Sequence, residues 1–198
     1  NNRYPSSKKP FVASYVKSLG EVFTSLGLQV DFLVDTGNSD SKLGQIRDLA
    51  RYNLKVLTSK KLTESDVLVI NHFQLYWAAL KKRVSSKQTL IFHWHGSEIK
   101  GSSKFQNFDE WNTDPLILDG FHVFPSEYFK NLVLEKVPGL KNWKVIPTGG
   151  VDTALFFERE KELSDTLTIG FAGHLRKEKG VDFFLRLIDQ QEEIEKQK

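Results

Sequence analysis

The chain has 198 residues, of which 39% are hydrophobic and 27% charged, so it suits one large domain, or one domain and part of another, with a packed core. Its formal net charge of only +3, without an arginine-rich patch, argues against nucleic acid as a partner. The absence of Cys excludes disulfides and cysteine-bound metals and permits a reducing compartment.

Neither a signal peptide nor an apolar run of about 18 residues is present, so we expect nothing in these residues to span a membrane. We expect a cytoplasmic location, either free or peripheral at the inner face of the membrane. The chain also has no Met, even at position 1, so we expect its natural N-terminus to lie ahead of Asn1.

The N-terminal third of the chain predicts loop, helix, strand and helix. Residues 1–10 are polar and contain two prolines, which favours a loop. Apolar residues at steps of three and four predict a helix over 11–26, capped by Gly27. A strand over 28–34 and a helix over about 41–59 follow. The residues expected on the inner face of that second helix are Leu43, Ile46, Leu49 and Ala50.

Short apolar runs then alternate with helical segments. Strands are expected over 66–70, 89–92, 120–124 and 143–147, and helices over 72–82 and 127–136. Such runs are typical of strands buried on both faces of a sheet. A charged segment over 153–166 indicates a linker, and a last strand and helix lie between 168 and 189.

This alternation predicts an α/β fold, a Rossmann-like parallel sheet with helices on both faces. We expect one domain over 1–152, the linker over 153–166, and an incomplete second Rossmann-like domain over 167–198, because one strand and one helix cannot bury a core alone. Ligands should bind beyond the carboxyl ends of the strands.

His95 follows the strand at 89–92 and precedes Gly96 and Glu98. An imidazole there can hydrogen-bond a substrate hydroxyl or stabilise a developing charge, although it is also explained as a loop histidine with its hydrogen bonds satisfied. His93 shares its strand face, but no third ligand stands at a recognised spacing, so we expect no metal.

Other strand ends carry further candidates. Ser126 follows the strand at 120–124 and is expected to cap the next helix, to line a cleft, or both. Gly149 and Gly150 permit close backbone approach or a simple turn, and Asp152 can cap a helix or bind a ligand.

The segment Gly173 to Gly180 places cations between an apolar strand and a helix start. Arg176 and Lys179 there can hold a phosphate, or they can be a solvated basic turn. The segment contains neither a P-loop nor a dinucleotide-binding glycine pattern.

In order and spacing, several segments resemble a retaining glycosyltransferase of the GT-B fold, family 4 type, over nearly the whole chain. The segments are Tyr4-Pro-Ser-Ser-Lys-Lys, Gly27-Leu-Gln-Val-Asp, His95-Gly-Ser-Glu98, Phe124-Pro-Ser126, Val145-Ile-Pro-Thr-Gly-Gly-Val-Asp152 and Ile169-Gly-Phe-Ala-Gly-His-Leu-Arg-Lys-Glu-Lys-Gly-Val-Asp182.

The resemblance implies an enzyme that moves a sugar from a nucleotide-sugar donor to a glycan or lipid-linked acceptor without a metal or cofactor. It implies two Rossmann-like halves with a cleft between them, the first binding the acceptor and the second the donor. His95 would approach the transferred sugar, and Lys179, with Arg176 and Gly173, would bind the donor phosphates. Glu98, Ser126, Gly149, Gly150 and Asp152 would line the cleft on the acceptor side.

The chain departs from the family pattern in four ways. His174 stands where an Arg is usual, and Gly149 where an Asn is usual. The first strand and its following glycine-rich turn are absent or not included, and the paired glutamates around the donor sugar are not found before Lys198. We therefore expect these 198 residues to be inactive alone, as part of a longer enzyme.

Two other hypotheses remain. The chain can be the acceptor-binding subunit of a split transferase whose partner supplies the donor site, because the apolar helix over 181–188 would otherwise be exposed. An unrelated hydrolase is disfavoured by the lack of a Gly-x-Ser-x-Gly motif.

Peripheral contact with a membrane is a further possibility. Lysines near Phe11 and Tyr15 can contact anionic lipid, or they can be the solvated lysines of an ordinary amphipathic helix that packs on the core. The sugar, the nucleotide base and the acceptor are not specified.

Overall fold

The structure, a computed structural model, describes residues 14–34, 39, 41–100, 106–147, 157, 169–173, 175 and 177–196. The chain divides into two compact units, residues 1–150 and 151–198. The expected loop at 1–10, and the expected linker except for Phe157, lie outside the described residues.

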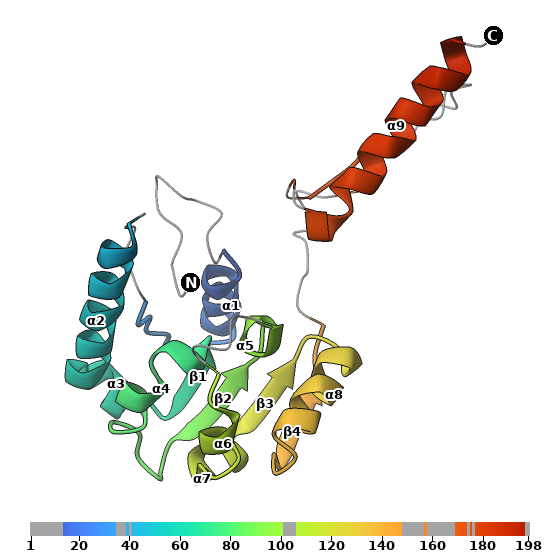
Figure 1. Ribbon diagram of the computed structural model, residues 1–198. Coiled ribbons are helices and arrows are strands. Elements are labelled where there is room, and N and C mark those ends of the chain that lie inside the picture. The colour runs from blue at the N-terminus through green and yellow to red at the C-terminus, as the bar shows by residue number, and fades with distance from the viewer. Residues whose placement is uncertain are drawn as a thin grey trace. The chain divides into compact units, whose positions relative to one another are not determined.

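Four parallel strands form the sheet of the first unit, in the order β1-β2-β3-β4 (Figure 1). Residue Val67 of β1 lies opposite Thr89 of β2, and Phe121 of β3 lies opposite Asn142 of β4. The strands are β1 (Val67–Asn71), β2 (Thr89–His93), β3 (Phe121–Phe124) and β4 (Asn142–Val145). Because all four strands are parallel, their carboxyl ends lie at the same edge of the sheet.

Helical segments connect the strands. In the first unit these are α1 (Ser14–Ser25), α2 (Lys42–Thr58), α3 (Lys60–Glu64), η1 (Phe73–Leu75), α4 (Trp77–Leu80), α5 (Ser97–Lys100), α6 (Phe108–Trp111), α7 (Pro115–Leu118) and α8 (Glu127–Lys136). The α/β class with a parallel sheet is therefore confirmed, and the arrangement is consistent with a Rossmann-like fold.

The second unit contains the short 3-10 helix η3 (Lys177–Lys179) and the helix α9 (Val181–Lys196). The helix expected near the C-terminus is therefore confirmed. The strand expected before it does not form at residues 169–172, which have no regular secondary structure. A strand needs a hydrogen-bonded neighbour, and the described residues of this unit supply none.

The prediction of a strand over 28–34 is also wrong. This segment has no regular secondary structure and joins no ladder of the sheet. Side chains of α2 hold it instead. The hydroxyl of Tyr52 donates to the carbonyl of Leu33 at 2.9 Å, and Lys55 Nζ donates to the carbonyl of Val34 at 3.4 Å. Helix α1 before it is confirmed, and Gly27 takes the expected left-handed conformation, with φ of +82°.

Helix α2 forms where expected, but with a different inner face. Ser41 caps it by accepting a hydrogen bond from the Gly44 N–H at 3.1 Å. The buried positions are Asp48, Tyr52 and Val56, one turn apart, whereas Leu43 and Ile46 are exposed. The apolar spacing of the sequence predicted a helix correctly but placed its buried stripe on the wrong side.

Aromatic side chains dominate the core of the first unit. Phe73 lies at its centre and is 1% exposed. Its ring centroid is 4.9 Å from that of Trp111, 5.1 Å from that of Phe92 and 5.2 Å from that of Trp94. Tilted and edge-to-face contacts of this kind stabilise a core beyond simple burial of area. The helix expected over 72–82 is divided into η1 and α4, and Phe73, the first residue of η1, lies in the aromatic cluster.

His122 is a polar residue inside this aromatic core. It is fully buried on β3, and its ring is stacked on Phe92 at 5.0 Å. Its Nδ1 accepts a hydrogen bond from Trp94 Nε1 at 3.0 Å, so Nε2 carries the ring proton and donates to the carbonyl of Ile117 at 2.8 Å. Burial lowers the pKa of His122 from 6.5 to about 4, against the hydrogen bond to Ile117, which raises it.

We expect acid to destabilise the first unit through His122. Its pKa is lower in the folded chain than in the unfolded chain, so the unfolded chain binds a proton first as the pH falls below 6.5. The resulting loss between pH 7.5 and 4.5 should be about 2 to 3 kcal/mol of unfolding free energy. Urea unfolding at both values should show this loss in the natural chain and a smaller loss in H122Q, whose amide does not titrate. Equal losses in the two chains would contradict the assignment.

Candidate functional site

Polar side chains gather at the carboxyl ends of β1 and β2. Asn71 ends β1 and His72 follows it, while His93, His95 and Glu98 stand at or after the end of β2. This is the edge at which parallel α/β sheets bind ligands. Of the residues chosen from the sequence, His95 and Glu98 belong to this cluster.

Glu98 is the buried anchor of the cluster. It lies in α5 and is 0% exposed. Its Oε2 accepts a hydrogen bond from the backbone N–H of His95 at 3.1 Å, and its Oε1 lies 3.1 Å from His72 Nδ1. Burial alone would raise the pKa of Glu98, but the hydrogen bond and charge of His72 and the nearby His95 hold it below its usual range. Glu98 therefore ties the loops after β1 and β2 together as a carboxylate.

His72 links this carboxylate to helix α1. Its backbone is left-handed, with φ of +51°, the one positive value outside glycine among the described residues. Its Nε2 lies 3.2 Å from the hydroxyl of Tyr15, and its Nδ1 faces Glu98. In the neutral ring with its proton on Nδ1, Nδ1 faces Glu98 and Nε2 accepts from Tyr15, which produces a tyrosine–histidine–glutamate chain. Burial and the charge of Glu98 raise the pKa of Tyr15 to about 12, so its hydroxyl keeps its proton at neutral pH.

His95 lies at the centre of the group. Its Nε2 is 2.8 Å from Asn71 Oδ1, and its ring centroid lies 4.5 to 4.6 Å from those of Tyr15, His72 and His93. Burial, with the charges of His72 and His93, lowers the pKa of His95 to about 3, although the charge of Glu98 raises it. Because Nε2–H donates a hydrogen bond to the Asn71 oxygen, Nδ1 of the neutral ring is the hydrogen-bond acceptor. The ring can therefore orient a hydroxyl without carrying charge.

Gly96 holds the loop after β2 close to helix α8. Its φ is +88°, and a Cβ added there would lie 2.5 Å from Cε1 of Phe129. Both the conformation and the close approach require glycine. The turn that presents His95 and Glu98 is thus fixed by the residue between them.

Ser126 serves as the N-cap of α8, because its Oγ accepts a hydrogen bond from the Phe129 N–H at 3.3 Å. The capping role expected from the sequence is confirmed, and its cleft-lining role stays a prediction. Gly173 and Lys179 lie in the second unit, where Lys179 ends η3 just ahead of Gly180 and α9. Arg176, Gly149, Gly150 and Asp152, together with His174, lie outside the described residues.

Sequence reasoning missed Tyr15, Asn71 and His72. Asn71 and His72 carried a usable signal, because they are polar residues directly after a continuous apolar strand. Tyr15 carried none, since its spacing marks it as one more apolar position of α1. Its contact with His72 depends on how α1 packs, which is a tertiary property.

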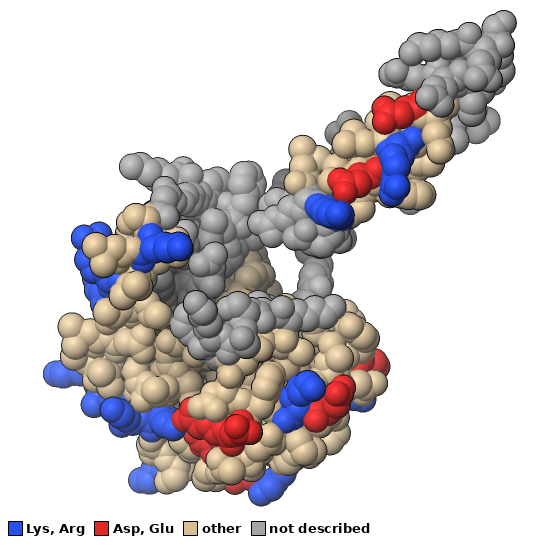
Figure 2. All heavy atoms as spheres, in the orientation of Figure 1, with Lys and Arg blue, Asp and Glu red and all other residues tan. Residues whose placement is uncertain are grey.

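Among the described residues, His, Asp and Glu form no group of three or more that could hold a metal ion. No helix among these residues has both the length and the apolar character needed to cross a bilayer. Figure 2 shows Lys and Arg interspersed with Asp and Glu over the viewed face, without one continuous positive patch.

Comparison with known proteins gives no relative. No protein-family model matches the chain, and no curated protein or solved structure matches it significantly.

We expect the substitution G96A to destabilise the first unit more than G27A. Both glycines have left-handed backbones, but an added Cβ meets Phe129 only at Gly96 and nothing within 4 Å at Gly27. The strained conformation and the clash should together cost about 2 to 4 kcal/mol in G96A, against about 1 kcal/mol in G27A. Urea unfolding of the three chains measures both losses. Equal losses would show that the loop moves away from α8 freely.

Proposed function

We propose that this chain is part of a GT-B glycosyltransferase that transfers a sugar from a nucleotide-sugar donor to a glycan or lipid-linked acceptor, without a metal. The observation that carries the proposal is His95 at the carboxyl end of β2, whose ring lies 2.8 Å from Asn71 Oδ1 and whose pKa is lowered to about 3, chiefly by burial, so that it is neutral. Its position agrees with the order of motifs in the sequence, His95-Gly-Ser-Glu98 foremost.

In such a transfer, the bond between the anomeric carbon and the donor diphosphate breaks, and the nucleoside diphosphate leaves with the electron pair. The acceptor hydroxyl forms the new bond to that carbon, and its proton passes to an oxygen of the leaving diphosphate. A neutral imidazole beside the sugar can hydrogen-bond one of its hydroxyls throughout, and a fixed hydrogen bond of this kind lowers the barrier by orienting the reactants.

The second unit supplies the proposed phosphate contact. Lys179 is exposed and is followed by Gly180, with φ of +79°, and then by the 16 residues of α9. A lysine beside the N-terminus of a helix favours a bound phosphate through its charge and through the helix dipole. In the proposed reaction, this contact stabilises the charge of the leaving diphosphate.

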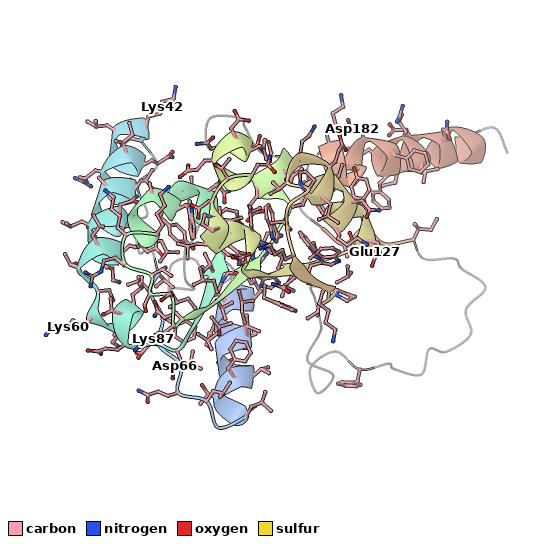
Figure 3. All side chains as sticks on the ribbon, turned by 90° about the horizontal axis from the view of Figure 1, so that it is seen from below. Lys42, Lys60, Asp66, Lys87, Glu127 and Asp182 are labelled. Carbon is pink, nitrogen blue, oxygen red and sulfur yellow. The ribbon has the colours of Figure 1, made fainter. Side chains whose placement is uncertain are left out.

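We expect the chain to bind uridine or guanosine diphosphate in isothermal titration calorimetry. The substitution K179A should weaken binding about tenfold or more, because it removes a charge-assisted hydrogen bond of about 1.5 to 3 kcal/mol. K87A is the matched control, since Lys87 precedes β2 at the amino end of the sheet (Figure 3). Equal affinity in K179A and K87A, or no preference over inorganic phosphate, would remove the proposed donor site.

We expect H95A to lower the rate of sugar transfer about a hundredfold, within the usual range for a positioned imidazole. The assay measures radiolabelled sugar moved from a panel of nucleotide-sugars onto glycans and lipid extract by the full natural polypeptide. The control is again K87A, which should retain the natural rate. Unchanged transfer in H95A would show that this histidine is structural.

The binding-subunit hypothesis is supported by one observation. Helix α9 exposes Phe183 at 62%, Leu185 at 53% and Ile188 at 43%, and apolar surface of this kind favours a partner. If the chain is one subunit of a split transferase, we expect light scattering to show association that F183K weakens. A monomer over the micromolar range would count against it.

A further inference from the structure

A large cavity borders β1 on the side away from β2. Its volume is about 780 Å³, and it lies between β1, the segment 28–34 and the helices α1, α2 and α4. Voids larger than one water molecule are few in a packed domain, and a water occupies about 30 Å³. A space on the order of 25 waters beside an apolar strand is therefore a feature to explain, not a packing defect.

The lining shows that the cavity lies between two chain edges. All seven residues of 28–34 border it, and so do all seven of 65–71. Successive side chains of an extended segment point to opposite faces, so a cavity on one face would touch every second residue. Contact with every residue on both sides places the cavity in the plane of the sheet, between the backbones.

Strand β1 has the sequence of an inner strand and the position of an outer one. Its run Val67-Leu-Val-Ile70 is continuously apolar, which is typical of strands with neighbours on both edges. Among the described residues, however, β1 has β2 as its single neighbour, and Val67 is 49% exposed. Exposed edge strands are normally protected by charged residues or proline, and β1 contains neither.

Helices pack over the cavity in the way that helices of an α/β fold pack over a strand of the sheet. Helix α1 contributes Val16, Leu19 and Phe23, and further apolar groups come from α2 and α4, among them Val56 and Leu80. A small-molecule pocket of this size usually presents a few convergent polar groups. Here the hydroxyls of Tyr52 and Tyr76 already donate to the carbonyls of Leu33 and Asn71.

We infer that this cavity is a slot for one further β-strand, which runs parallel to β1 and belongs to the same polypeptide, ahead of Asn1. The strand would have about six mainly apolar residues, the usual length in globular proteins. It would hydrogen-bond β1 on one edge and the segment 28–34 on the other, which would then become the strand that its sequence predicts. The inference does not depend on sugar transfer.

The connection through α1 identifies the source of the strand. In a strand–helix–strand unit, the helix packs on its two neighbouring parallel strands through a right-handed crossover. Helix α1 leads into the segment 28–34 and lines the cavity beside it, so the first strand of that unit belongs in the slot. Residues 1–13 contain two prolines and four basic or hydroxylic residues in a row, Ser6 to Lys9, which suit a connection better than a strand.

The experiment extends the chain ahead of Asn1 by six Val, Ile and Leu residues. The matched control carries proline at the second and fourth added positions, which removes backbone donors at similar hydrophobicity. Hydrogen exchange followed by mass spectrometry or NMR reads the amides of β1 and of 28–34, with those of β4 as the reference. We expect at least tenfold slower exchange in β1 and 28–34 with the apolar extension than with the proline control, and a higher urea midpoint.

Two results would overturn the inference. Equal exchange in the apolar and proline extensions would show that the cavity does not accept a strand. Slower exchange only when the same six residues are added as a separate peptide would show that the strand comes from another polypeptide.

Discussion

The buried carboxylate of Glu98 is the constraint on which the site depends. A charge with no exposure is tolerated only where it is paired or hydrogen-bonded, and Glu98 meets this condition through the N–H of His95 and the ring of His72. These two partners follow different strands. Satisfying one carboxylate therefore fixes the ends of β1 and β2 relative to each other, and the neutral ring of His95 is positioned as a result. Removing the charge would leave both loops without their common acceptor.

The aromatic core supports this arrangement from below. Phe73 follows His72 directly in the chain and packs among the rings of Phe92, Trp94 and Trp111. Trp94 in turn precedes His95, and its N–H is bound by His122. His72 and His95 are thus each next in sequence to a side chain buried in the core. This alternation of buried ring and polar group explains how short loops can hold the site in a defined geometry.

The fold class could be read from the sequence, because short apolar runs separated by helical patterns are specific for parallel α/β sheets. The failures have physical causes. Residues 28–34 have the composition of a strand, but a ladder requires a neighbour, and composition does not report whether one is present. The phase of α2 was misjudged because Leu43 and Ile46 are apolar without being buried. In the site, His95 and Glu98 could be identified from their place beside Gly96 after an apolar strand. The position of the His72 side chain depends on a left-handed backbone, which no local sequence pattern predicts.

Tyr15 belongs to two features at once. Its ring lines the cavity beside β1, and its hydroxyl reaches His72 while its ring contacts His95. Any event that repacks α1 against the cavity must therefore move a group that touches the histidines. A rotation of α1 by one residue, about 100°, would withdraw that hydroxyl altogether. One side chain, Tyr15, therefore links the packing at the edge of the sheet to the histidines at the strand ends. Incomplete assembly of the sheet would then lower the order of the site.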